Sequence, residues 1–223
     1  MHTAPFKPHD LAAILFDLDG TLIDTDNVDV ARWERRLARL YGQPGARAGA
    51  RARQFVMALE TPVNAAFTLL DLVGLDTPII RLMVALQGSD QPDQLPAVSS
   101  TPSLIQALAG CYKIGIVTTR TVAQARAFAS AQGFHDNISV IAGRDSTWRI
   151  KPHPQPVQYA AHALGISTQQ CLMVGDTTVD IKAGRRAGAW TCGVLCGYGY
   201  RAELERAGAH IILDHTSQLA SLL

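Results

Sequence analysis

The sequence of 223 residues lacks long hydrophobic runs and lacks an excess of charge of either sign. No segment approaches the roughly 18 continuous apolar residues of a membrane span, and residues 1–10 lack the apolar stretch of a secretory signal. We therefore expect a cytoplasmic protein with no membrane partner. Its 20 basic and 19 acidic residues nearly cancel, so we expect no nucleic-acid partner either.

Cysteine is scarce, and the sequence has no internal repeat and no low-complexity tract. The four cysteines form no Cys-x-x-Cys pair, and three of them stand in apolar runs. This pattern favours buried thiols over disulfides or zinc ligands. Hydrophobic residues make up 48% of the chain, which is enough to bury a core.

Short apolar runs bounded by turn residues alternate with amphipathic helical patterns through most of the chain. The runs predict buried strands at 12–16, 114–117, 139–142, 171–174, 191–195 and 210–213. Helical spacing predicts helices at 103–108, 123–131, 157–164, 179–187 and 202–207, the last three ending at Gly165, Gly188 and Gly208. Alternation of this kind predicts an α/β fold, with a parallel, Rossmann-like sheet covered by helices on both faces.

One interval, from residue 26 to about residue 91, contains helical patterns and no convincing strand. We interpret it as an all-α cap domain (residues 23–97) inserted after the first strand of a core domain that comprises residues 1–22 and 98–223. Ligands of parallel sheets bind at the carboxyl ends of the strands. The inserted helices would therefore form a lid over that end of the first strand.

Two acidic residues, Asp17 and Asp19, follow the first predicted strand directly. The two-residue period of an extended chain places both carboxylates on the same side. Such a pair is stable when a cation binds between the carboxylates or when one of them holds a proton, as in a catalytic site. The alternative is an ordinary turn, because Asp-Gly is a common turn dipeptide.

Three further predicted strands end in residues with matching chemistry. Thr118 and Thr119 follow the second strand and could hold phosphate oxygens through hydroxyl and backbone N–H groups. The alternative is that Thr119 or Thr121 simply caps the next helix. Lys151, which follows the third strand in a proline-stiffened loop, could hold a phosphoryl group or be merely solvated. Asp176 and Asp180, at the fourth strand and one helical turn later, favour a metal, although Asp176 could also cap the helix.

These four segments, in this order, resemble the motifs of the haloacid dehalogenase-like hydrolases, and most closely the branch of phosphoglycolate phosphatase and beta-phosphoglucomutase, which carries a helical cap at the same place. The resemblance implies that Asp17 is the nucleophile and Asp19 the general acid and base. It implies that Mg²⁺ is bound by Asp17, the backbone carbonyl of Asp19, and Asp176, with support from Asp180. Thr118, Thr119 and Lys151 would hold the phosphoryl oxygens.

The implied activity is Mg²⁺-dependent hydrolysis of a small-molecule phosphate monoester through an aspartyl-phosphate intermediate. A phosphomutase of the beta-phosphoglucomutase type shares every core motif and stays an alternative, as does, more remotely, a non-catalytic binding module on the same fold. Dehalogenation is disfavoured, because dehalogenases of the superfamily lack an acid two residues after the nucleophile.

Substrate selection in this architecture resides in the cap, whose sequence is the least recognisable part of the chain. Arg120 could lie near the leaving group or be an exposed arginine at the start of a helix. Arg47, Arg51 and Arg53 are candidates for binding an anionic part of the substrate. The sequence leaves open the identity of the substrate and whether the protein is a monomer or a homodimer.

Overall fold

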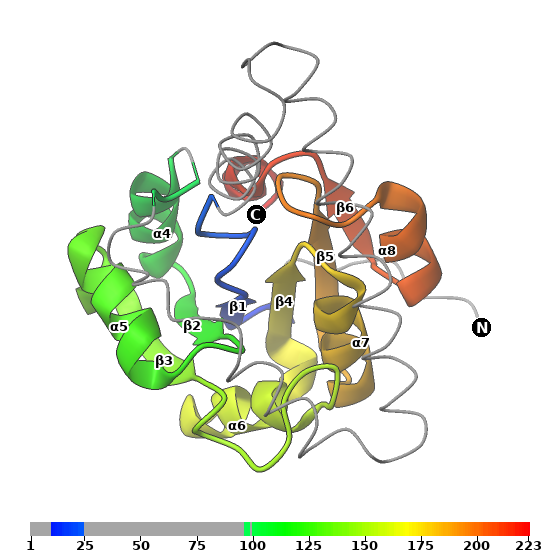
Figure 1. Cartoon of the computed structure of the whole chain (residues 1–223), viewed down its shortest axis with the longest axis horizontal. Coiled ribbons are helices and arrows are strands. Elements are labelled where there is room, and N and C mark those ends of the chain that lie inside the picture. The colour runs from blue at the N-terminus through cyan, green and yellow to red at the C-terminus, as the bar shows by residue number, and fades with distance from the viewer. Residues whose placement is uncertain (1–9, 25–95, 99) are drawn as a thin grey trace, which may run out of the picture.

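The computed structural model describes residues 10–24, 96–98 and 100–223 (Figure 1). Most of the predicted cap domain, with Arg47, Arg51 and Arg53, lies outside these ranges. The predicted bounds of the two domains therefore remain expectations. Among the described residues, no helix is long and apolar enough to cross a bilayer.

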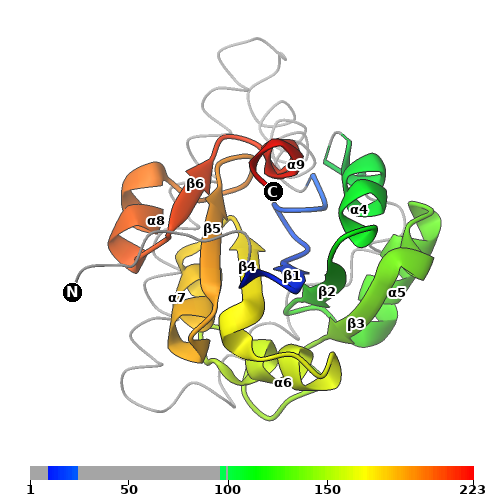
Figure 2. The ribbon, with the colours of Figure 1, turned by 180° about the vertical axis from the view of Figure 1, so that it is seen from behind.

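A six-stranded sheet forms the centre of the described structure, and every pair of neighbouring strands is parallel. The strand order is β3-β2-β1-β4-β5-β6 (Figure 2). The strands are β1 Ala13–Phe16, β2 Lys113–Val117, β3 Ile138–Ala142, β4 Cys171–Gly175, β5 Trp190–Val194 and β6 Ile211–Leu213. The predicted fold class is confirmed.

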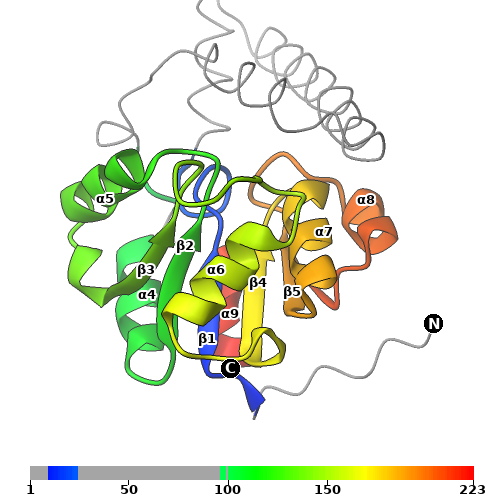
Figure 3. The same ribbon diagram turned by 90° about the horizontal axis from the view of Figure 1, so that it is seen from below.

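Helices cover both faces of the sheet (Figure 3). They are α4 Thr101–Ala109, α5 Val122–Ala131, α6 Gln155–Ala163, α7 Thr178–Ala187, α8 Arg201–Ala207 and the short α9 Leu219–Leu222. Gly188 and Gly208 adopt the left-handed conformation at the ends of α7 and α8, and Gly165 adopts it just after the end of α6. The three predicted stops are confirmed. Three short 3₁₀ helices, His135–Asn137, Thr168–Gln170 and Thr216–Gln218, complete the structure of the described residues.

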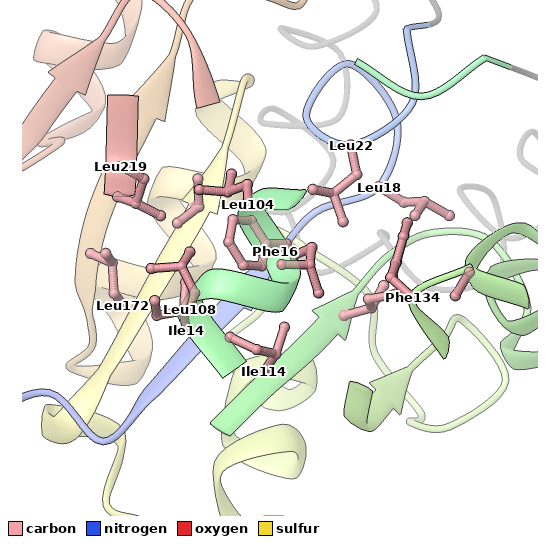
Figure 4. Packing of buried hydrophobic residues seen from close by; sticks show 14 of the residues in the cluster. Ile14, Phe16, Leu18, Leu22, Leu104, Leu108, Ile114, Phe134, Leu172 and Leu219 are labelled. Carbon is pink, nitrogen blue, oxygen red and sulfur yellow. The ribbon is translucent and has the colours of Figure 1, made fainter. Parts of the chain in front are cut away.

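The core is built in two layers because successive side chains of β1 point to opposite faces of the sheet. Ile14 and Phe16 pack in a cluster that includes residues of α4 and α9 (Figure 4), whereas Ala13 and Leu15 pack in a second cluster with residues of α6 and α7. All four residues of β1 are fully buried. Strand β1 is therefore fixed from both sides, and so is the position of the residue that follows it.

The four cysteines are free. Cys171 and Cys192 are buried, as their apolar surroundings predicted, Cys196 is partly exposed and Cys111 is exposed. The expectation of free thiols is confirmed, whereas the expectation of burial holds for only two of the four.

The chain leaves and re-enters the described core at one place. Val98 donates a backbone hydrogen bond to Leu22, Asp24 donates one to Pro96, and Ile23 forms an antiparallel bridge with Ala97. Residues 22–24 and 96–98 thus lie side by side. The chain therefore leaves the core in the loop that follows β1 and returns to it beside that same loop.

Candidate functional site

The site is built on the carboxyl ends of three neighbouring strands. Phe16 pairs with Ile116 on one side and with Val174 on the other. Asp17 therefore extends β1 between the ends of β2 and β4, where its backbone N–H donates to the carbonyl of Val174. The topology thus brings together residues that are far apart in sequence.

Lys151 is the central cation of the site. Its Nζ lies 2.6 Å from Oδ1 of Asp17 and 2.6 Å from Oδ1 of Asp180, and it also donates to the carbonyl of Val117 at 2.8 Å. Only 5% of Lys151 is exposed. Burial by itself lowers the pKa of this amine, but the two carboxylates outweigh burial and raise the pKa above its usual value. Lys151 is therefore a fixed positive charge.

Asp17, Asp176 and Asp180 form a buried acidic cluster whose ligand atoms all lie within 4.8 Å of one another. Three carboxylates and one ammonium group leave two negative charges to be balanced. Burial, and next the charge of Asp180, raise the pKa of Asp17 to about 7, although Lys151 pulls in the opposite direction. Oxygen ligands and an unbalanced charge of this size suit a divalent cation such as Mg²⁺.

Asp176 is held by groups from two other loops. Its Oδ1 accepts a hydrogen bond from the hydroxyl of Thr21 at 3.3 Å, and its Oδ2 accepts one from the backbone N–H of Tyr198 at 2.9 Å. A Cβ atom on Gly20 or Gly197 would collide with the same carboxylate. These close approaches leave Asp176 fully buried, with its carboxylate in a fixed orientation.

Asp180 links α7 to the site. Its Oδ2 accepts hydrogen bonds from the backbone N–H and the hydroxyl of Thr177, at 3.1 Å and 2.6 Å, while its Oδ1 contacts Lys151. Thr177, and not Asp176, is the N-cap residue of α7. The alternative that Asp176 serves as the helix cap is therefore wrong.

Asp19 makes an ion pair with Arg120. The guanidinium donates from Nε at 2.8 Å to Oδ2 and from Nη2 at 2.7 Å to Oδ1. This is the two-point geometry in which arginine binds carboxylates most strongly. The side chains are 18% exposed for Arg120 and 29% exposed for Asp19, so this pair lies closer to solvent than the buried cluster.

Thr118 and Thr119 begin the loop after β2. Thr118 is buried, and its hydroxyl accepts a hydrogen bond from the backbone N–H of Arg120 at 3.1 Å. Thr119 is partly exposed. The helix α5 is capped by Thr121, which forms a reciprocal capping box with Gln124, so neither Thr118 nor Thr119 is needed as the cap.

The structure thus brings Asp17, Lys151 and Asp180 into direct contact and places Asp176 beside them. Sequence reasoning missed Thr21 and the backbone of Tyr198 as partners of Asp176. It also missed Asp19 as the partner of Arg120.

The protein thus has a doubly wound α/β fold with a buried carboxylate cluster and a lysine at the carboxyl edge of its parallel sheet. The family model of the haloacid dehalogenase-like hydrolases matches residues 11–188. The chain belongs to this hydrolase family.

Similar proteins agree with this assignment. The chain is 32% identical to an N-acetylmuramic acid 6-phosphate phosphatase of Pseudomonas aeruginosa, over 96% of this chain and 95% of that protein. It is 31% identical to the pyrophosphatase PpaX of Bacillus cereus, over 94% and 95% of the two chains. A haloacid dehalogenase-like hydrolase structure from Streptococcus pneumoniae shares the fold, with a TM-score of 0.66 and 21% identity over 96% of this chain and 99% of that one.

Proposed function

We propose that the protein is a Mg²⁺-dependent phosphatase that hydrolyses a small-molecule phosphate monoester through an aspartyl phosphate formed on Asp17. The observation that carries this proposal is the position of Asp17. It directly follows the central strand β1, beside Lys151 and within a buried cluster of three carboxylates. The phosphatase names of the two relatives favour hydrolysis over the phosphomutase reaction.

Charge repulsion is the main obstacle to this reaction. A carboxylate that attacks a phosphate dianion meets like charge, and each unit pair at about 4 Å costs roughly 4 kcal/mol at an effective dielectric of 20. Lys151 offsets part of this cost, because it is held within hydrogen-bond distance of the attacking carboxylate. Bound Mg²⁺, held by Asp17, the carbonyl of Asp19, and Asp176 with support from Asp180, would supply further charge neutralisation.

Asp19 is proposed as the general acid and base. Asp19, protonated when substrate binds, donates its proton to the leaving oxygen as Asp17 takes the phosphoryl group and the bond from phosphorus to that oxygen breaks. It then removes a proton from the water that hydrolyses the aspartyl phosphate, a contribution of roughly 10² to 10⁴-fold. Thr118, Thr119 and Lys151 hold the phosphoryl oxygens during both steps, so that catalysis rests on positioning and charge neutralisation.

Substitution of the nucleophile tests the proposal. We expect wild-type protein to release phosphate from a panel of small phosphate esters when Mg²⁺ is present and not when a chelator is present. The Asp17→Asn variant should fall below detection, because an amide is too weak a nucleophile to form the intermediate.

A matched control is Asp136→Asn, which changes an exposed aspartate of the short helix His135–Asn137. It should keep wild-type activity, and circular dichroism should show that both variants are folded. Full activity of folded Asp17→Asn would overturn the assignment of the nucleophile.

A further inference from the structure

Lys151 and Arg120 both bind carboxylates of the site, but their positions differ. Lys151 is buried among Asp17, Asp180 and the carbonyl of Val117, where it can serve only the phosphoryl group and the nucleophile. Arg120 lies on the outer side and binds Asp19, with part of its side chain exposed. It is therefore placed toward the part of the substrate that is not transferred.

The contact with Asp19 fixes how far Arg120 is from the leaving group. In the proposed reaction, the protonated carboxyl group of Asp19 donates a hydrogen bond to the ester oxygen. Nη2 of Arg120 lies 2.7 Å from Oδ1 of that carboxylate, and Nε lies 2.8 Å from Oδ2. The guanidinium is thus about two hydrogen bonds from the ester oxygen, and substituents on the next few atoms of the leaving group come within its reach.

The backbone of Arg120 is held on both sides. Its N–H donates to the hydroxyl of Thr118 at 3.1 Å, and its carbonyl accepts a hydrogen bond from the backbone N–H of Arg144 at 2.9 Å. A Cβ atom on Gly143 would come within 2.9 Å of the same carbonyl, so the two loops pack closely. The position of the Arg120 backbone is consequently set by the ends of β2 and β3, and the ion pair with Asp19 orients its guanidinium.

We propose that Arg120 selects phosphate esters whose leaving group carries a second anionic group, a carboxylate or a phosphate, a few bonds from the ester oxygen. A guanidinium has five N–H donors in a planar fork that matches both anions, and it can bind Asp19 and a second anion together. A neutral leaving group of the same shape gains no such contact. This inference rests on the proposed phosphatase activity.

Pairs of esters with an anionic and a neutral leaving group test the proposal. The carboxylate pair is phosphoglycolate and its amide, 2-phosphoglycolamide. The phosphate pair is 1,2-ethanediol bisphosphate and 2-hydroxyethyl phosphate, and 4-nitrophenyl phosphate serves as a generic ester. For wild-type protein we expect kcat/KM to favour the anionic member of at least one pair by about tenfold or more, and the preferred pair tells which anion is recognised.

The variants separate recognition from positioning of Asp19. Arg120→Gln should reduce the anionic-to-neutral ratio about tenfold, mainly through KM, and Arg120→Lys should retain part of the preference because the positive charge remains. Arg126→Gln, which changes an exposed arginine of α5, is the matched control and should keep the wild-type ratio.

The remaining outcomes are distinguishable. An equal loss on both members of each pair in Arg120→Gln would mean that Arg120 only orients Asp19, and the inference would be wrong. It would also be wrong if wild-type protein hydrolysed 4-nitrophenyl phosphate without preferring any anionic ester, and the phosphatase activity would then still stand. If no ester, 4-nitrophenyl phosphate included, released phosphate, the proposed function itself would fail.

Discussion

Three carboxylates and one ammonium group share the buried centre of the site. The excess of negative charge affects the stability of the protein as well as its chemistry. Burial and the neighbouring Asp180 raise the pKa of Asp17 to about 7, far above that of an aspartate in an unfolded chain. A carboxylate with a raised pKa works against folding once it is ionised. Its penalty is absent at a pH below 4 and complete above about pH 7.

This excess of negative charge predicts that Asp17→Asn stabilises the metal-free protein at pH 8, although it removes the proposed nucleophile. The amide removes one negative charge and can still accept a hydrogen bond from Lys151. A gain of about 1 kcal/mol in the free energy of unfolding would raise Tm by roughly 2 to 4 °C. Thermal unfolding in the presence of chelator measures this difference.

The complementary expectation concerns the metal. Mg²⁺ should raise Tm of the wild-type protein, because a ligand that binds only the folded state stabilises it, and should raise Tm of Asp17→Asn less. A lower Tm for the metal-free variant than for wild-type protein would show that the ion pair with Lys151 outweighs the repulsion.

His210 is a second residue whose protonation is coupled to folding. Its Nδ1 accepts a hydrogen bond from the backbone N–H of Thr191 at 3.0 Å, its Nε2 contacts Arg185, and its ring packs edge-on against Trp190. Burial, and then the charge of Arg185, lower the pKa of His210 to about 4. The folded protein therefore binds this proton more weakly than the unfolded chain does.

A histidine whose pKa falls on folding loses its stabilising effect as the pH decreases. We expect the free energy of unfolding to fall between about pH 6.5 and pH 4, where the unfolded chain takes up the proton and the folded protein does not. Urea unfolding of the wild-type protein and of His210→Asn across this range measures the effect. The amide can replace Nδ1 as acceptor, so the variant should show a shallower dependence on pH, and an identical slope would contradict the assignment.

At the scale of elements, α7 holds the loop of Lys151 at two points. Asp180, in its first turn, binds the ammonium group of Lys151, and Arg186, in its last turn, donates from Nη1 to the carbonyl of Pro152 at 3.1 Å. The helix therefore acts as a rigid support that spans the loop. Because Arg186 holds the loop of Lys151 through the carbonyl of Pro152, we interpret it as a positioning residue.

Neighbouring arginines on α7 allow a matched test of this support. Arg186→Ala should lower kcat, by up to about 10²-fold if Lys151 moves by about 1 Å, whereas Arg186→Lys should recover part of the loss. Arg185→Ala, which removes the contact with His210, should leave kcat unchanged. Steady-state kinetics with one hydrolysed ester checks all three variants, and equal kcat for Arg186→Ala and wild-type protein would argue against the support.

Each of the six strands begins and ends within one residue of the predicted positions. The prediction works because buried parallel strands are short apolar runs bounded by turn residues. Asp17, Thr118 and Asp176 could be predicted at the site for the same reason, since each follows a strand directly. Their proximity then follows from the parallel arrangement alone.

The hydrogen-bond and ion-pair partners of the site residues could not be predicted from local sequence. The pair of Arg120 and Asp19 joins residues 101 positions apart, and the hydrogen bond from Thr21 to Asp176 joins residues 155 positions apart. Such contacts depend on the side-chain rotamers and on the packing of loops from different strands. Gly197 and Gly199 were the sequence features that could have indicated a contact with Asp176, because each lets the chain pass close to that residue.

At the scale of the whole molecule, the strand that comes first in the sequence lies in the middle of the sheet. Both faces of β1 are covered, and both of its edges are paired, by β2 and by β4. The helices and loops that position Lys151, Asp176 and Arg120 all come later in the chain. The site thus collects its residues around a single early segment.

The central place of β1 has a consequence for synthesis on the ribosome. Its first partner, β2, begins at Lys113 and its second, β4, at Cys171, so at 5 to 20 residues per second the strand waits roughly 5 to 20 s for the first and longer for the second. During that time it is an apolar segment with two open edges, which other chains or chaperones can bind. A nascent chain that stops before β4 carries Asp17 but lacks Asp176 and Asp180, the other two carboxylates of the buried cluster.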